Sequence, residues 1–126
     1  MTSDYVLDAS AILALLNNEP GADRVQEVLM DKACTMSVVN WSEVVRKLVL
    51  RSQPVESVAQ SLMGLGLAFQ DFNYRQATAT AQIMALSLSL GDRACLALSL
   101  ELSATALTAD KIWQTLALDV NVELIR

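Results

Sequence analysis

The chain has 126 residues, of which 53% are hydrophobic, and this length and composition suit a single domain over 1–126 with a sizeable core. Nine Lys and Arg residues against fourteen Asp and Glu residues give a net charge of −5, opposite to the basic footprint of most nucleic-acid binders. The sequence contains no histidine, which excludes Ser-His-Asp triads, histidine zinc sites and imidazole acid–base chemistry. Its four glycines form neither a dinucleotide-binding fingerprint nor a P-loop.

Both cysteines, Cys34 and Cys95, stand alone in apolar stretches. We therefore expect buried thiols of a reducing compartment rather than a disulfide or a metal clip. The first residues lack the basic region of a signal peptide, and the uncharged run 76–91 is polar and too short to span a bilayer. These features predict a cytoplasmic protein with no membrane segment.

The first half of the chain alternates short apolar runs with stretches of helical period. In chain order, the pattern predicts a strand over 5–8, helices over 10–17 and 22–30, a strand over 33–36 and a helix through 41–49. Ser37 stands where it can cap the last of these helices. The apolar residues of that helix recur at i, i+3 and i+4, so it has one apolar face.

The second half continues the alternation. In chain order, we expect a helix over 55–63, a strand over 67–72, a helix from 73 to about 88, a helix from 91 to about 102, a strand over 105–107, a helical stretch over 110–116 and a closing strand over 120–125. Pro54 suits the first turn of the helix that follows it. Asn73, with Gln76 three residues later, is typical of a helix start with a capping box.

Strands separated by helices predict an α/β fold, in which a mostly parallel central sheet is covered by helices on both faces. The functional crevice of such a sheet lies beyond the carboxyl ends of its strands. Charged residues that directly follow a strand are therefore the first candidates for a functional site.

Asp8 directly follows the first predicted strand and lies in an apolar stretch. An ionised carboxylate in apolar surroundings costs several kcal/mol unless hydrogen-bond donors or a cation compensate it. The structural alternative is an N-cap of the following helix, a role that Ser10 could also fill. Position alone favours neither interpretation.

Asp92 opens a predicted helix after Gly91, and Asp110 follows a predicted strand. Capping explains each of them alone, and so does an ion pair between Asp92 and Arg93. However, Asp8, Asp92 and Asp110 all fall at strand-to-helix junctions or helix starts on one expected edge of the sheet, which three independent caps would not require. Together they favour a site for a hard cation.

Glu43 lies roughly opposite the apolar face of its helix, beside Arg46 and Lys47. This spacing favours a solvated helix face with ion pairs at i+3 and i+4 over a functional role. Trp41 and Trp113 belong to apolar helical stretches, so we expect core or interface anchors rather than platforms for stacked bases.

Four segments resemble the PIN-domain nucleases, and most closely the VapC-like toxin ribonucleases. They are VLDASA (6–11), NWSEV (40–44), LGDRACLAL (90–98) and LTAD (107–110). Each segment alone is a weak signal, but their order and spacing extend the resemblance over nearly the whole chain.

The resemblance implies a three-layer α/β/α fold with an acidic pocket that binds Mg²⁺ or Mn²⁺ and cleaves RNA. Four residues match the family's acidic positions, namely Asp8, Glu43, Asp92 and Asp110. Of these, Asp8, Asp92 and Asp110 are the implied metal ligands, and Ser10 and Thr108 match the accompanying hydroxyl positions. Oxygen ligands suit these ions, and a metal-activated water replaces the missing histidine as the source of the nucleophile. Because clustered acids repel one another, we expect a raised pKa for at least one of them without metal.

Arg46, Lys47 and Arg51 share the predicted helix of Glu43 and provide local positive charge. They either line an approach for RNA or form a solubilising helix face, and the sequence leaves both open. The resemblance further implies a homodimer and the role of the toxin in a type II toxin-antitoxin pair. The partner antitoxin would insert a basic segment into the acidic pocket.

Two alternatives of another class remain. The first is a catalytically idle PIN-fold module that regulates by binding protein or RNA, although an intact acidic set argues against it. The second is a phosphatase or phosphoacceptor domain, which the first strand disfavours because it offers Asp8-Ala9-Ser10 without a second aspartate two residues on. Metal-dependent RNA cleavage discriminates the nuclease from both.

Overall fold

The computed structural model describes residues 3–126, and its first half alternates strands and helices as the hydrophobic pattern predicts. The elements are β1 (Tyr5–Leu7), α1 (Ala9–Leu16), α2 (Ala22–Asp31), β2 (Cys34–Ser37) and α3 (Val38–Leu50). The Ser37 hydroxyl accepts a hydrogen bond from the Val39 amide and so caps α3 as expected. Gly21 precedes α2 with a φ of 96°, where a side chain would collide with Ile125.

The second half differs from the prediction in one helix. The elements are α4 (Val55–Gly64), β3 (Leu67–Gln70), α5 (Tyr74–Ala81), α6 (Leu90–Leu102), β4 (Thr105–Thr108), the 3₁₀ helix η1 (Lys111–Thr115) and β5 (Val122–Leu124). Asn73 caps α5 as expected, but the extension of this helix to about Leu88 is wrong, because 82–89 forms turns. Ile83 and Leu88 are both buried, and a continuous helix would place them about 140° apart. The irregular segment instead lets both reach the core while Leu86 is fully exposed.

The strands form one five-stranded sheet in the order β3-β2-β1-β4-β5, and every pairing is parallel. The first strand is central, with Tyr5 paired to Cys34 on one side and to Thr105 on the other. Because β1 and β4 are parallel neighbours, their carboxyl ends meet at the same edge of the sheet. The expected parallel α/β architecture is confirmed.

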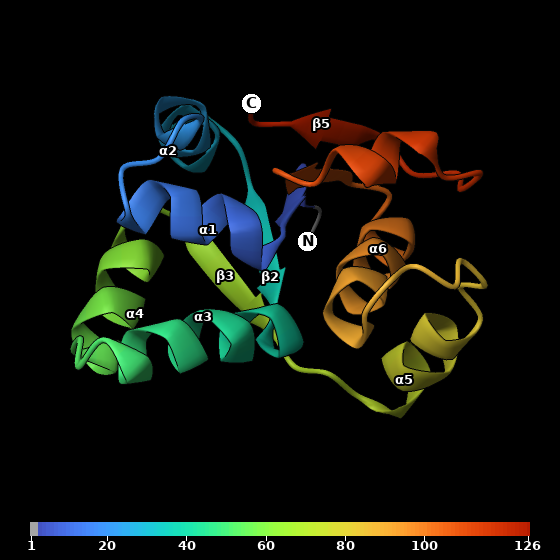
Figure 1. Cartoon of the computed structure of the whole chain (residues 1–126), viewed down its shortest axis with the longest axis horizontal. Coiled ribbons are helices and arrows are strands. Elements are labelled where there is room, and N and C mark those ends of the chain that lie inside the picture. The colour runs from blue at the N-terminus through green and yellow to red at the C-terminus, as the bar shows by residue number, and fades with distance from the viewer. Residues whose placement is uncertain (1–2) are drawn as a thin grey trace.

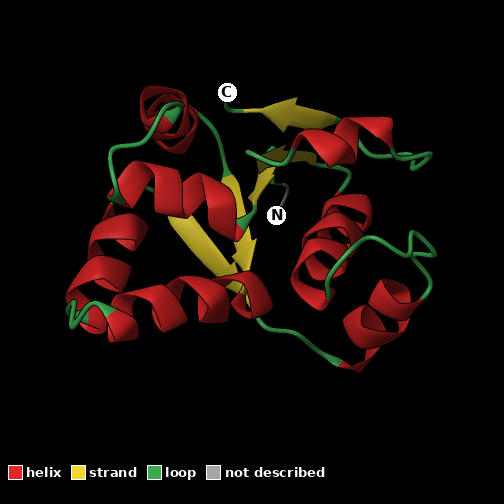
Figure 2. Cartoon of the chain, in the orientation of Figure 1, coloured by secondary structure: helices red, strands yellow, loops and turns green. Residues whose placement is uncertain are grey.

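Helices cover both faces of this sheet (Figures 1 and 2), and side chains alternate between two cores along β1 and β4. Leu7 and Leu107 point into the core shared with α1 to α4. Val6 and Ala106 point into the core that α6 and η1 close, where Trp113 is fully buried as expected of a core anchor. The result is the three-layer α/β/α arrangement.

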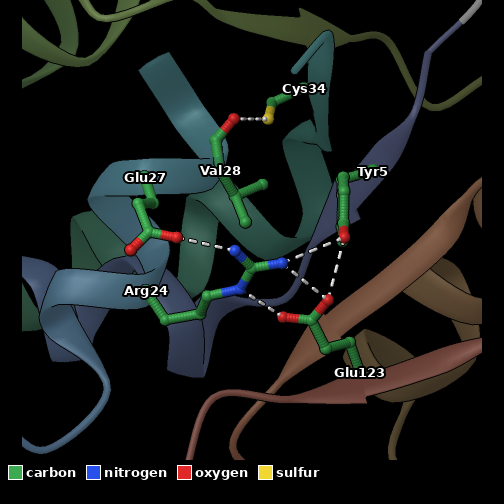
Figure 3. A network of polar contacts seen from close by, with 6 residues as sticks. All are labelled: Tyr5, Arg24, Glu27, Val28, Cys34 and Glu123. Carbon is green, nitrogen blue, oxygen red and sulfur yellow. Dashed lines mark hydrogen bonds and ion pairs between the residues drawn. The ribbon is translucent and has the colours of Figure 1, made fainter. Parts of the chain in front are cut away.

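A polar network ties the edge strand β5 to β1 and α2 (Figure 3). The Arg24 Nε donates to Glu123 Oε2 at 2.8 Å, and its Nη2 donates to Oε1 at 3.1 Å. The Tyr5 hydroxyl donates to Glu123 Oε1 at 2.8 Å, while Arg24 Nη1 pairs with Glu27. Hydrogen bonds from Arg24 lower the pKa of Glu123, and burial raises the pKa of Tyr5.

The two cysteines are buried and free of a disulfide, as expected. The Cys34 thiol donates to the Val28 carbonyl oxygen at 3.4 Å (Figure 3), and burial raises its pKa to about 11. Between residues 3 and 126, every helix is too short or too polar to cross a bilayer.

Candidate active site

Asp8 lies where β1 ends and α1 begins, and its carboxylate is buried, with 6% of the residue exposed. Asp8 occupies the N-cap position of α1, as the structural alternative predicts, but its side chain makes no capping hydrogen bond. Instead, Oδ2 accepts hydrogen bonds from the Ser10 hydroxyl at 2.7 Å and from the Thr108 hydroxyl at 2.9 Å. The pKa of Asp8 is raised, chiefly by burial and also by the charge of Asp92, while the two hydroxyls lower it.

The two hydroxyls are oriented by backbone amides at the end of β4. The Ala109 amide donates to Ser10 Oγ at 2.9 Å, and the Asp110 amide donates to Thr108 Oγ1 at 3.1 Å. Each hydroxyl oxygen therefore accepts from the backbone and directs its own proton to Asp8. Ser10 and Thr108 thus both contact Asp8, and they link the ends of β1 and β4.

Asp92 belongs to the first turn of α6 and forms a capping box with Ser89. The Ser89 amide donates to Asp92 Oδ2 at 3.1 Å, and the Asp92 amide donates to Ser89 Oγ at 3.1 Å. One oxygen of the Asp92 carboxylate, Oδ2, therefore caps α6, as the capping alternative predicts. The charge of the same carboxylate also raises the pKa of Asp8 and of Glu43.

Glu43 lies on the exposed side of α3, as its spacing predicts, but within residues 3–126 it forms no ion pair with Arg46 or Lys47. The side chain extends from α3 to α6, where its carboxylate lies against the backbone of Gly91, and Oε1 accepts a hydrogen bond from Asn40 Nδ2 at 3.2 Å. Burial is the main cause of its raised pKa, the Asn40 hydrogen bond lowers it, and the charges of Asp8 and Asp92 raise it further. Helical periodicity predicted the exposed side of the helix correctly, but it treats each helix as isolated and so could not show the contact with α6.

Asp110 is the least integrated of the four acids. Its Oδ1 accepts a hydrogen bond from the Ile112 amide at 3.0 Å, which caps η1. Its connection to Asp8 runs through the Thr108 hydroxyl. The structure therefore brings together the charges of Asp8, Glu43 and Asp92, and holds Asp110 beside them at the neighbouring strand end.

The ion pairs of the described chain involve other carboxylates than the four acids of the site. Within residues 3–126, the ion pairs use four further glutamates, namely Glu19, Glu27, Glu101 and Glu123. Lys47 and Arg51 line a cavity of about 300 Å³ between α1, α3 and α4, where the Arg51 guanidinium donates to Asn17 at 2.9 Å, whereas Arg46 does not line it. Within residues 3–126, the acids of the cluster therefore have no basic side chain as an ion-pair partner. Two basic residues line a crevice beside the helix that carries Glu43.

Carboxylates with raised pKa values and no cationic partner are the donor chemistry that suits Mg²⁺ or Mn²⁺. In the part of the chain that the structure describes, no three Asp, Glu or Cys side chains lie close enough to hold a metal ion as they stand. The capping bonds of Asp92 and Asp110 account for part of this separation, since they hold each carboxylate at its own helix end. The residues fit a hard cation by the chemistry of their oxygen donors.

Two residues beside the cluster carry no role in the sequence analysis. Asn40 is fully buried and bridges Glu43 to the carbonyl oxygen of Gly91 at 2.9 Å. Gly91 leaves the space that the Glu43 carboxylate fills. The sequence offered two signals for these roles. Asn40 is a polar residue one turn before Glu43, and Gly91 is a glycine within a predicted helix, where glycine is unfavourable.

Comparisons with known proteins were made on sequence and on structure. A family model of the PIN domain matches residues 5–118. A search of curated proteins found no match. Among solved structures, the fold is similar to a toxin-antitoxin complex from Klebsiella pneumoniae, with 16% identity, a TM-score of 0.78 and 98% of each chain covered.

Two further structures extend this similarity. VapBC from Salmonella typhimurium, solved bound to DNA, has 15% identity, a TM-score of 0.74 and 100% of each chain covered. VapBC2 from Rickettsia felis, solved with a DNA fragment from its promoter, has 14% identity and a TM-score of 0.70, with 95% of this chain and 97% of that chain covered. At these identities the structures show a shared fold. Since the family model spans most of the sequence, the chain belongs to the PIN domain family.

Proposed function

We propose that this protein is a metal-dependent endoribonuclease that acts in the cytoplasm as the toxin of a toxin-antitoxin pair. The observation that carries the proposal is the buried carboxylate of Asp8, which lies at the carboxyl edge of a parallel sheet with neutral partners and two further acids nearby. Family membership and the toxin-antitoxin complexes among its structural neighbours support the same assignment.

The chain's residues divide the work by their positions. Asp8, Asp92 and Asp110 would hold the ion, and Ser10 and Thr108 keep Asp8 in one orientation. A bound Mg²⁺ or Mn²⁺ supplies neutralisation of the scissile phosphate and activation of the attacking water. Glu43 would be the proton acceptor beside the ion, since a raised pKa makes a carboxylate a better base near neutral pH.

The substrate must reach an acidic pocket on an acidic protein. Lys47 and Arg51 provide positive charge in a crevice along α3, about one and two turns after Glu43. Phosphate contacts from such residues position a nucleic acid without reading its sequence. We assign the approach of RNA to Lys47 and Arg51, and Arg46 to the solvated side of the helix.

Cleavage of RNA by the purified protein tests the enzyme. We expect activity with Mg²⁺ or Mn²⁺, none with a chelator, and loss of activity in Glu43→Gln. Glu56→Gln is the matched control, because Glu56 is an exposed glutamate in the first turn of α4. Cleavage that persists in chelator contradicts the metal mechanism, and an inactive wild type with bound RNA favours the idle regulatory module.

Growth of bacteria that produce the chain tests the toxin role. We expect wild type to arrest growth, Glu43→Gln and Asp110→Asn to be harmless, and the protein encoded by the neighbouring gene to restore growth to cells with wild type. A basic segment of that partner would complement the uncompensated acids of the pocket. Harmless wild type contradicts the toxin role and leaves the nuclease standing. The mass of the purified protein in solution tests the proposed homodimer.

A further inference from the structure

Gly91 is the second residue of α6, and its backbone does not require glycine, since its φ is not positive. Glycine weakens a helix relative to alanine, so its presence here needs another reason. A Cβ atom at this position would lie 2.5 Å from Oε1 of Glu43 and 2.8 Å from its Oε2. Those distances are shorter than ordinary van der Waals contact, so any side chain at 91 would displace the carboxylate.

Asn40 holds the same carboxylate from the other side. It lies one turn before Glu43 on α3, is fully buried, and donates from Nδ2 both to Glu43 Oε1 and to the carbonyl oxygen of Gly91. Turning the amide over would place its oxygen against two other oxygens, so these acceptors fix its orientation. Within the described chain the Asn40 Oδ1 has no hydrogen-bond partner, a cost that packing alone does not explain.

These contacts join two helices at the acidic cluster. The amide of Asn40 ties the start of α3 to the start of α6, one residue before Asp92. Asp92 is itself held by the capping box of α6. The distance between the carboxylates of Glu43 and Asp92 therefore depends on how closely Glu43 can approach the α6 backbone.

We propose that Gly91 and Asn40 are positioning residues for Glu43: the missing side chain at 91 creates the seat of its carboxylate, and the Asn40 amide keeps it there. The expected effect on catalysis rests on the proposed function, because Glu43 acts on substrate only if the chain is a nuclease. The seat itself is a property of the fold.

The test compares Gly91→Ala with a matched glycine. Gly91→Ala is expected to melt at or above the temperature of wild type, yet to lose about 10- to 100-fold in kcat with little change in KM, the scale of a catalytic group misplaced by about 1 Å. Its affinity for Mn²⁺, measured by calorimetry, should also fall, because Glu43 is not one of the proposed ligands but its negative charge would lie farther from the ion. Gly64→Ala in α4 is the control, because nothing lies within 4 Å of a Cβ there. It should leave kcat and Mn²⁺ affinity unchanged.

A double-mutant comparison shows whether the effect passes through Glu43. In a Glu43→Ala background, Gly91→Ala should leave the Mn²⁺ affinity unchanged, because no carboxylate remains to displace. An equal loss of Mn²⁺ affinity in both backgrounds, or wild-type kcat in Gly91→Ala, overturns the proposal while leaving the nuclease intact. If wild type neither cleaves RNA nor binds Mn²⁺, the proposed function fails, and a crystal structure of Gly91→Ala decides the seat. A displaced Glu43 carboxylate supports it, and an unmoved one overturns it.

Asn40→Leu tests the second half of the proposal, since leucine has a similar volume and no donor. We expect a loss of kcat in the same direction as for Gly91→Ala, with KM little changed. A folded Asn40→Leu protein with wild-type kcat removes Asn40 from the proposal. Should this variant fail to fold, Asn40→Ser, which is too short to bridge both acceptors, takes its place with the same expectations.

Discussion

Two groups of carboxylates on the same sheet differ in what balances their charge. Glu123 on β5 receives two nitrogen donors from Arg24 and the hydroxyl of Tyr5, and the hydrogen bonds from Arg24 lower its pKa. Asp8 at the end of β1 receives two neutral hydroxyls, and burial raises its pKa. The first arrangement favours the charged form and the second disfavours it.

The difference separates structure from function. A carboxylate paired with a guanidinium joins elements of the fold, as Glu123 joins β5 to α2 (Figure 3). A buried carboxylate with no cation is unfavourable for the folded protein alone, and becomes favourable when a cation or substrate completes the site. Substitutions in the two groups should therefore have different effects on stability and on activity.

The largest expected effect comes from exchanging one carboxylate of each group for an amide. Asp8→Asn should reduce RNA cleavage more than about 100-fold, because it removes a proposed metal ligand. This loss exceeds the one usually seen when a residue that only orients a ligand is changed. Its melting temperature should not fall, because the amide oxygen still accepts both hydroxyls and the buried charge is gone. Glu123→Gln should show the opposite pattern, with full cleavage and a slightly lower melting temperature. Loss of stability in Asp8→Asn, or of cleavage in Glu123→Gln, would erase the distinction.

A smaller effect is expected from removing one neutral partner of Asp8. Thr108→Val keeps the shape of the side chain but leaves Asp8 with one hydroxyl donor and raises its pKa further. Metal affinity and cleavage should fall about tenfold, as for other partners that orient a metal ligand. Thr105→Val, at the opposite end of β4, is the matched control and should behave as wild type. Equal activity of the two variants would show that the hydroxyl does not orient Asp8.

The stabilisation of the folded protein by Mg²⁺ should depend on pH. Asp8 and Glu43 have raised folded-state pKa values, chiefly through burial. Below the unfolded-state values near pH 4 both states are protonated, so there is no penalty. As pH rises through those values the unfolded state ionises first, and stability falls until the higher folded-state pKa values are passed.

Mg²⁺ binds the ionised folded site and offsets this penalty. Thermal melts at about tenfold the dissociation constant should show a rise of about 5 °C near pH 7.5, and a smaller rise near pH 5. Asp92→Asn should weaken the response at the higher pH. Identical metal responses at both pH values, or in wild type and Asp92→Asn, would contradict the prediction.

The smallest effect concerns cations outside the cluster. Lys47→Glu should raise KM for RNA a few-fold and reduce the salt dependence of binding by about one unit of slope, because one phosphate contact is lost. Arg46→Glu is the matched control on the same helix, and does not line the crevice, so it should leave both quantities unchanged. The same loss in both variants would mean that the whole helix face, rather than the crevice, guides RNA.

Much of the fold could be predicted because its elements are locally encoded. Alternating apolar runs, Ser37 and Asn73 as caps, and the spacing of strands and helices gave the parallel architecture. The extension of α5 failed at 82–89, where Ile83 and Leu88 reach the core from turns. Local propensity could not show this, since burial of those side chains depends on α6 and on the sheet.

The sequence by itself predicted three of the acids at one edge of the sheet, because Asp8, Asp92 and Asp110 follow strands or open helices, and such positions share one edge of a parallel sheet. Only the tertiary structure decided what each acid does there. It placed the carboxylate of the exposed Glu43 against α6, and it gave Asn40 and Gly91 their contacts with that carboxylate. The physical reason is that periodicity describes one helix against an average interior, whereas the position of a long side chain depends on the particular neighbour it meets across the fold.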